Sequence, residues 1–350
     1  MIKPLHTRFR MSASGPLHVG HFLLASLSRE AARTTGGTFL VRAEALKCIH
    51  EFGREMNHRK WWDANFEELR SVGIVPTAPE VLNATEDLNA GMGWEVMEER
   101  ALQEFYWRKV GLEAMIGSWP PPIPPHEMEE RDKALRGWRS TTFGNYEFGG
   151  LHPYVMFATC VSDIARRRNC IIHGSDHKGE DQLTGFFGQL IAREMFGLDG
   201  WDDGDKYVPK HWFTPKIMRS GTTLSPDTPA YDHHIAGEPW PISSSYADLA
   251  AGFRIKDIAK SGVDPHIALR FLLRVMFGSD ENADRALDSW HGDVEWHVDT
   301  DLGDPRTYGA DRKPSIQHGP KSIFANAVRD PVIDDDEWFE LLGIDPEEAT

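Results

Sequence analysis

The sequence predicts an α/β fold built on a parallel sheet, and two stretches of the chain carry this prediction. The first is a strand–turn–helix–strand unit that extends from Thr7 to Glu44. The second is a short apolar strand, Cys170–Ile172, which a Gly-Ser-Asp-His turn at 174–177 follows. Open α/β sheets bind ligands at the carboxyl ends of their strands, so both turns are expected at a binding site.

The turn in the first unit delivers two histidines, His18 and His21, to the first turn of an apolar helix that reaches Gly36. Free backbone N–H groups and the helix dipole favour phosphate at such an N-terminus. Imidazoles there can donate hydrogen bonds to phosphate oxygens as charge develops. Gly20, between the histidines, has no Cβ to obstruct a base or a phosphate. The pattern therefore indicates a nucleotide site, and the alternative is a capped helix in which the histidines are incidental.

The rest of the chain is divided by composition and periodicity. Helices are expected at about 52–72, 94–115 and 264–278, where apolar residues recur at helical spacing. The proline-rich run at 118–125 is incompatible with a helix or a central strand and is interpreted as a stiff connector. The expected units are a first half of the nucleotide-binding domain at 1–85, an inserted helical subdomain on the acceptor side at 86–150, a second half at 151–235, a helical segment at 236–280 and a short acidic C-terminal tail at 281–350.

Composition places the chain among acidic globular proteins. Its formal net charge is −16 over 350 residues, which argues against a generally basic nucleic-acid surface. No apolar run approaches the roughly 20 residues that span a bilayer, and no signal peptide opens the chain, so a cytoplasmic location away from the membrane is expected. The three scattered cysteines lack metal-binding spacing, and the pair His233 and His234 has no third ligand at a known spacing, so no protein-bound metal site is predicted.

Five further segments carry a family resemblance: Arg8–His21, Phe39–Glu44, Tyr154–Asp163, Ile171–His177 and Ile255–Gly278. In this order they resemble the catalytic domain of the glutamyl- and glutaminyl-tRNA synthetases, which are class I enzymes with a HIGH motif. The resemblance implies a Rossmann-like fold and a reaction in which ATP activates the carboxylate of an amino acid as an aminoacyl adenylate. The chain resembles a truncated paralogue, since no counterpart of the family's anticodon-binding domain is recognised.

The resemblance also implies roles for individual residues. ATP, accompanied by Mg²⁺, would be held by His18, Gly20, His21, Gly174, Asp176 and Ser225. The amino acid would be held by Arg8, Ser12, Glu44, Tyr154, His173 and His177. The catalytic set would be His18 and His21 on the phosphates and Lys216 and Arg219 on the departing pyrophosphate.

Two departures from the family pattern concern specificity and catalysis. His173 stands where glutamyl-tRNA synthetases have the arginine that meets the side-chain carboxylate. Because an imidazole lacks the bidentate fork of an arginine, the side-chain pocket is expected to differ. The family also has a KMSKS loop, whose lysines stabilise the departing pyrophosphate. Its counterpart in this chain can be aligned in two registers. Aligned on Leu224 and Ser225 it loses both lysines, whereas 216–220 keeps two cations in a K-x-x-R-S pattern.

These observations predict amino-acid activation by ATP followed by transfer to a non-standard acceptor, such as a modified nucleoside, a nucleic-acid base or a small molecule. One alternative is aminoacylation of tRNA, either in the manner of a glutamyl-tRNA synthetase or in that of the relatives that glutamylate queuosine in tRNA. Another is a binding protein that kept the nucleotide fold and lost turnover. The expected partners are thus ATP, an amino acid and a possible nucleic-acid or modified-nucleoside acceptor.

Overall fold

The computed structural model describes the parts of the chain that carry most of the sequence motifs. The described residues are 6–12, 15–44, 58–77, 94–97, 141–143, 146–148, 174–179, 210–214, 217–221, 238–242, 250–288 and 331–345. Four predicted site residues, Tyr154, His173, Lys216 and Ser225, lie outside them, as does the proline-rich connector. Within the described residues, no helix is both long and apolar enough to cross a membrane.

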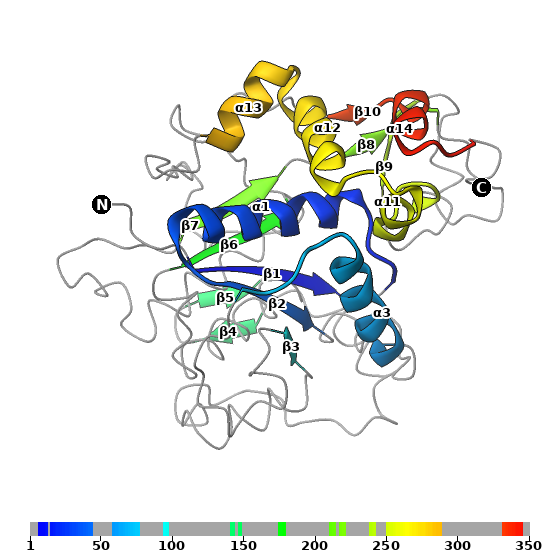
Figure 1. Cartoon of the computed structure of the whole chain (residues 1–350). Helices are drawn as coiled ribbons and strands as arrows, with labels where there is room; N and C mark the ends of the chain where they lie inside the picture. Colours follow the sequence, from blue (N-terminus) through cyan, green and yellow to red (C-terminus); the bar gives the residue numbers. More distant parts are fainter. Residues whose placement is uncertain are drawn as a thin grey trace.

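A five-stranded parallel sheet forms the centre of the fold (Figure 1). Its strands, in spatial order, are β3 (Trp94–Met97), β2 (Phe39–Glu44), β1 (His6–Ser12), β6 (Gly174–Gly179) and β7 (Lys210–Thr214). The chain builds outward from β1 on one side and later returns to build on the other, so the strand order reverses beside β1. Ligands bind at the carboxyl ends of the strands at such a reversal, and the turn after β1 leads to His18 and His21.

Two expectations for this sheet are wrong. The helix expected at 94–115 begins as a strand, because Trp94–Met97 pairs in parallel with β2. The turn expected at 174–177 lies within β6, which pairs in parallel with both β1 and β7. In both places, pairing with strands that are distant in the chain overrides the local signal, which is helical spacing of apolar residues in the first and a Gly-x-Asp turn pattern in the second.

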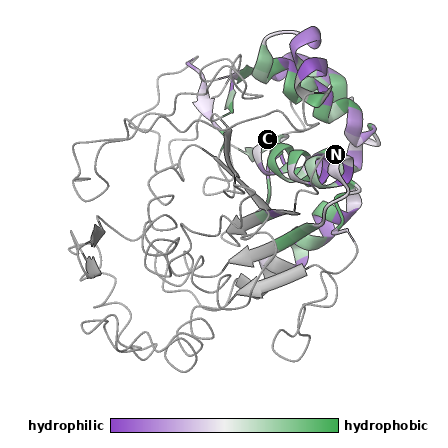
Figure 2. Ribbon diagram, turned by 90° about the vertical axis from the view of Figure 1, so that its left-hand side faces the viewer, coloured by the Kyte–Doolittle hydropathy of each residue, from purple (hydrophilic) through white to green (hydrophobic). Residues whose placement is uncertain are grey.

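Helices cover one side of this sheet. They are α1 (Val19–Thr35), α3 (His58–Ser71), α11 (Ile255–Ser261), α12 (Pro265–Phe277), α13 (Asp280–Asp288) and α14 (Asp335–Leu342). Figure 2 shows the described helices together on one side of the sheet, and α1 contacts β1 and β6 of the sheet as well as α12. The predicted helices at 52–72 and 264–278 correspond to α3 and α12 and are confirmed over the described residues.

Short strands complete the described structure. A second sheet has the order β10 (Val332–Ile333), β8 (Met218–Arg219) and β9 (Trp240–Pro241). Its β10 and β8 are parallel, and β8 and β9 are antiparallel. A separate antiparallel pair consists of β4 (Thr141–Phe143) and β5 (Tyr146–Phe148). The second sheet brings a strand from the KMSKS-like region beside a strand from the C-terminal part of the chain.

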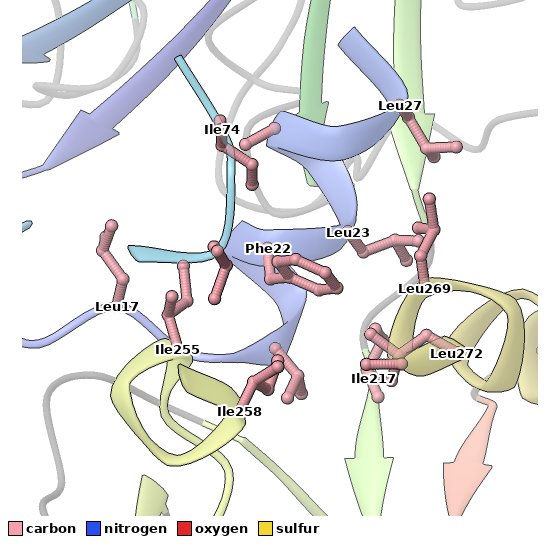
Figure 3. Packing of buried hydrophobic residues seen from close by; sticks show 14 of the residues in the cluster. Leu17, Phe22, Leu23, Leu27, Ile74, Ile217, Ile255, Ile258, Leu269 and Leu272 are labelled. Carbon is pink, nitrogen blue, oxygen red and sulfur yellow. The ribbon is translucent and has the colours of Figure 1, made fainter. Parts of the chain in front are cut away.

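The enclosure of α1 explains why its sequence is apolar on more than one side. Figure 3 shows Leu23 and Leu27 of α1 on the side that faces Leu269 of α12, with Ile255 and Ile258 of α11 near its first turn. Each such side chain contributes roughly 1.5–3 kcal/mol when fully buried. The helix begins at the His18 cap and ends where Gly36 adopts a left-handed conformation with φ 74°. One apolar core therefore holds residues 15–21 (the HIGH-type turn) and the segment that follows residues 216–226 (the KMSKS-like region).

The C-terminal part of the chain differs from the tail that composition suggests. Residues 331–345 form β10 and α14, and Trp338 of α14 is fully buried. Its indole Nε1 donates a 2.9 Å hydrogen bond to the carbonyl of Gly252, and its ring stacks on Phe253 at 5.9 Å between centroids. Asp336, Glu337 and Glu340 mask this apolar stripe in the sequence, because they occupy the exposed face of a short helix, whereas Asp335 is buried.

Candidate functional site

Two histidines cap the start of α1 reciprocally. The backbone N–H of Gly20 donates to Nδ1 of His18 at 3.1 Å, and the backbone N–H of His18 donates to Nδ1 of His21 at 3.2 Å. The two rings lie 4.0 Å apart between centroids. Because each Nδ1 accepts a hydrogen bond, the proton of each neutral ring is on Nε2. The caps therefore fix the orientation of both imidazoles and assign their donor atom.

The electrostatic environment keeps His18 neutral. Burial lowers the pKa of His18 well below its ordinary value, and repulsion from His21 lowers it further. Phe9, from the centre of β1, meets the ring of His21 edge-on at 6.3 Å between centroids. A neutral imidazole with its proton on Nε2 donates a hydrogen bond without carrying a fixed charge. The arrangement suits contact with phosphate oxygens whose negative charge increases during a reaction.

The His18 ring leaves little room for a side chain at Gly20. A Cβ on residue 20 would lie 3.0 Å from Cε1 and 3.2 Å from Nδ1 of His18. Contacts this short force a neighbouring atom to move. The glycine therefore has a structural reason in the cap, beside the close approach of a ligand that the sequence predicts.

Backbone hydrogen bonds join the HIGH-type turn to the segment before α11. Val19 N donates to Phe253 O at 2.8 Å, and Ile255 N donates to Leu17 O at 3.1 Å. Between these bonds, His18 and Arg254 form an antiparallel bridge. The turn is thus fixed along its length to residues more than two hundred positions later in the chain.

Helix α3 supports the same turn with two polar side chains that the sequence analysis missed. Asn65 is fully buried, and its Nδ2 donates a 3.1 Å hydrogen bond to the carbonyl of Gly15. Glu68, one turn later, accepts from the backbone N–H of Leu17. The available signal was a polar pair with i, i+3 spacing on the same helix as the buried Phe66 and Leu69, which places polar groups among core positions.

Burial perturbs Glu68. It raises the pKa of the carboxyl to about 6, with Asp257 adding to the rise and Lys256 and Arg254 opposing it. Its Oε2 is buried and has no hydrogen-bond partner, and the same holds for Oδ1 of Asn65. A carboxyl whose pKa is raised toward neutral pH therefore lies under the turn.

Arg219, the predicted pyrophosphate ligand, is engaged within the protein. Its Nε and Nη2 donate to Oδ2 of Asp335 at 3.1 and 2.6 Å, and both side chains are 11% exposed. Its Nη1 donates to Ala251 O at 3.3 Å, and its guanidinium lies 4.5 Å from the ring centroid of Phe253. Burial raises the pKa of Asp335, and the hydrogen bonds from Arg219 partly offset that rise.

The register of the central sheet places the residues predicted to hold the amino acid at two different heights along the strands. Ser12 and Glu44 are register partners at the carboxyl ends of β1 and β2. Arg8, which is buried, lies opposite Asp176 in the middle of the sheet. Among the predicted amino-acid ligands that the structure describes, Ser12 and Glu44 are therefore the pair at the strand ends from which the chain leads to the histidines.

The register does not bring all predicted residues to that edge. Gly174 pairs with His6, and His177 pairs with Phe9. Along a strand that rises about 3.3 Å per residue, His6 is roughly 20 Å from Ser12. The predicted role of Gly174 beside the nucleotide is therefore not supported by its position. Among the described residues, no group of three or more His, Cys, Asp or Glu side chains is placed to hold a metal ion.

Comparisons with known proteins give one local sequence match. No family model matches the chain. Over 73 residues it is 37% identical to the glutamyl-Q tRNA(Asp) synthetase of Rhodobacter capsulatus, a match that covers 21% of this chain and 24% of that protein. The matched part thus spans about a quarter of the relative's length.

Solved structures of synthetases are also similar. The glutamate-tRNA synthetase of Elizabethkingia anophelis has 14% identity and a TM-score of 0.42, covering 97% of this chain and 70% of that chain. The tryptophanyl-tRNA synthetase of Aeropyrum pernix K1 has 13% identity and a TM-score of 0.31, covering 61% and 50%. The local sequence match confirms the resemblance that the motifs predict: over that stretch, the chain is similar to the glutamyl-type class I aminoacyl-tRNA synthetases.

Proposed function

We propose that this chain is an ATP-dependent ligase of the glutamyl-tRNA synthetase type, which activates an amino acid as its adenylate and passes the aminoacyl group to an acceptor. The observation that carries the proposal is the reciprocally capped turn of His18, Gly20 and His21 after the central strand β1. It combines two oriented imidazoles, the N-terminus of a helix and the reversal point of a parallel sheet. That combination is suited to binding the phosphates of a nucleotide.

The chain's own residues would position reactants and stabilise charge, and no protein nucleophile is needed. Nε2 of His18 and of His21 would donate to the phosphates as the amino-acid carboxylate attacks the α-phosphorus. Glu44, at the carboxyl end of β2, would face the ammonium group of the amino acid, with Ser12 beside it on β1. Mg²⁺ would enter with ATP and screen the charge of its phosphates.

Of the two basic residues proposed for the pyrophosphate, Lys216 is the better candidate. It lies immediately before the described segment 217–221. The guanidinium of Arg219, by contrast, bonds to Asp335 and to Ala251 O. Lysine is a common phosphate ligand because its ammonium group acts as a compact point charge.

Two acceptors fit this chemistry. The relative that is 37% identical over 73 residues acts, by its name, on tRNA(Asp), which favours a tRNA-type acceptor. The net charge of −16 favours an acceptor smaller than a whole tRNA, because an acidic surface repels an RNA backbone. A nucleoside in tRNA and a free nucleoside or small molecule are therefore both proposed, and the transfer step distinguishes them.

Amino-acid-dependent exchange of pyrophosphate into ATP tests the activation step. Wild-type protein is assayed with each common amino acid singly, beside the variants H21N and H21Q. Asn keeps an acceptor near the position of Nδ1 and loses the distal donor, whereas Gln keeps a donor near Nε2. Exchange with one amino acid that falls tenfold or more in H21N and less in H21Q supports the proposal. ATP binding without exchange for any amino acid would favour the non-catalytic binding protein instead.

The acceptor is tested once exchange has named the amino acid. The protein is incubated with ATP, the radiolabelled amino acid and either total tRNA or a mixture of free nucleosides. Label that becomes acid-precipitable and sensitive to ribonuclease identifies tRNA as the acceptor. Label that moves to a small product with no precipitable counts identifies a free nucleoside or a small molecule.

A further inference from the structure

The C-terminal strand and helix hold the residues of the KMSKS-like region. Strand β10 pairs with β8, so that Met218 lies opposite Val332 and Arg219 opposite Ile333. Met218 N donates to Pro331 O at 2.8 Å, and Ser220 N donates to Ile333 O at 2.9 Å. Residues 331–333 therefore fix the backbone on both sides of Arg219.

Asp335 adds side-chain contacts to the same segment. Its backbone N–H donates to Oγ of Ser220 at 3.0 Å, and its Oδ2 accepts both bonds from Arg219. Gly221, with φ 62°, turns the chain so closely that a Cβ there would lie 3.4 Å from Oδ2 of Asp335. Asp335 thus bonds Arg219 through its carboxylate and Ser220 through its backbone N–H, and the same carboxylate lies close to Gly221.

Three consecutive carbonyls connect this pair to the HIGH-type turn. Ala251 O accepts from Nη1 of Arg219, Gly252 O accepts from Nε1 of Trp338, and Phe253 O accepts from Val19 N. The donors come from β8, from α14 and from the first residue of α1. Residues 251–253 therefore form a junction in which the KMSKS-like strand, the C-terminal helix and the HIGH-type turn all meet.

We propose that Arg219 and Asp335 are a positioning pair that sets β8 against the HIGH-type turn through the junction 251–253, and that Arg219 is not a ligand of pyrophosphate. The inference rests on the proposed function, because it assigns the pair to the activation step. The hydrogen bonds of the guanidinium to Asp335 and to Ala251 O point into the protein, and its face covers Phe253. A phosphate could take this group only by leaving the buried carboxylate of Asp335 without its counter-charge, which is costly.

The test is a double-mutant cycle of R219Q, D335N and the double variant, assayed by ATP–pyrophosphate exchange. The matched control is the cycle of R274Q and E337Q, because Arg274 and Glu337 also join α14 to the rest of the fold, at 2.8 Å, but with side chains 36% and 55% exposed. Each variant is checked for its unfolding temperature. If R219Q does not fold, R219K, which keeps the charge but not the fork, replaces it.

We expect R219Q and D335N each to lower kcat for exchange tenfold or more, with the KM for pyrophosphate unchanged. We expect the double variant to be no worse than either single one, since both remove the same pair. The control cycle should leave kcat within twofold of the wild type. A tenfold rise in the KM for pyrophosphate in R219Q alone would make Arg219 a phosphate ligand and overturn the inference. The inference would also be overturned if R219Q and D335N kept the wild-type kcat and only their unfolding temperatures fell.

Amide hydrogen exchange separates failure of this inference from failure of the proposed function. If the wild type exchanges no pyrophosphate with any amino acid, the proposed function fails, and the positioning pair is then judged in the unliganded protein. D335N should accelerate amide exchange at Ser220, which it contacts, and also at Val19, which it reaches only through the junction. Acceleration at Ser220 with no change at Val19 would overturn the inference.

Discussion

Replacing Glu68 by Gln should remove a pH dependence from the stability of the fold. The carboxyl accepts from Leu17 N beneath the HIGH-type turn, and burial raises its pKa from 4.5 to about 6. Glutamine keeps an oxygen that can accept the same hydrogen bond, but it has no proton to lose in this range. The substitution therefore isolates the titration of one group with little change in packing.

The direction in which stability changes with pH follows from the direction in which the pKa of Glu68 is shifted. Because the pKa is higher in the folded state than in the unfolded chain, the folded protein binds the proton more tightly. The resulting stability is fully present below about pH 4.5 and is lost as the pH rises through about 6. Between pH 5 and pH 7.5 the shift corresponds to at most about 1.2 kcal/mol, and solvent screening of this partly buried carboxyl reduces it to roughly 0.5–1 kcal/mol.

Urea unfolding at pH 5, 6 and 7.5 measures this effect as a difference between E68Q and wild type. A difference is needed because His18, whose pKa is lowered, contributes the opposite slope, while Asp335, whose pKa is raised, adds to the slope of Glu68. The control is E67Q, a substitution at the exposed neighbour on the same helix, which should run parallel to wild type. Stability curves of E68Q and wild type that stay parallel from pH 5 to pH 7.5 would refute the reasoning.

Three further substitutions have expected outcomes. G20A should leave the stability within about 1 kcal/mol of wild type, because helix propensity offsets the contact with His18, yet lower pyrophosphate exchange tenfold or more; unchanged exchange would contradict this. N65A should cost about 1–3 kcal/mol in urea unfolding, because it strands the buried carbonyl of Gly15, whereas a loss below 0.5 kcal/mol, on the order of a surface substitution, would contradict it. W338F should cost about 2–4 kcal/mol by removing the bond to Gly252 O and leaving a gap in the core; a tail without packing would show no loss.

Elements whose apolar residues follow one local period could be predicted from the sequence. The helix before Gly36 and the helix at 264–278 are amphipathic or apolar along their whole length, and their ends carry left-handed glycines, Gly36 and Gly278. The strand at 39–44 begins with apolar residues that favour a strand and follows the Gly36-Gly37 helix end. These signals are local, so the chain around each element is sufficient to show it.

Elements whose state depends on distant partners could not be predicted in this way. Trp94–Met97 is a strand because β2 offers it an edge, and Gly174–Gly179 is a strand because it lies between β1 and β7. The role of 331–342 depends on pairing with β8 and on the carbonyl of Gly252. Period and turn signals carry no information about such partners.

The residues of the candidate site also fall into those with a local sequence signal and those that depend on distant partners. His18, Gly20 and His21 were predicted together because they are contiguous and act within one turn of helix. Asn65 and Glu68 support that turn from another helix, and the sequence gives no reason to pair them with Gly15 and Leu17. The contiguous residues proposed to contact a ligand are therefore visible in the sequence, whereas the residues that hold their turn are found only in the fold.

Geometry, more than fixed charge, therefore distinguishes this site. His18 is held neutral by burial and by His21, and the charge of Arg219 is matched by Asp335. Under the proposed function, the described residues would offer a triphosphate a set of oriented donors: the N-terminus of α1 and two imidazoles whose Nδ1 atoms are already satisfied. Oriented neutral donors stabilise developing charge only while their positions are exact to a few tenths of an ångström. That requirement explains why a glycine, a buried asparagine and three consecutive carbonyls at 251–253 are all used to fix one turn.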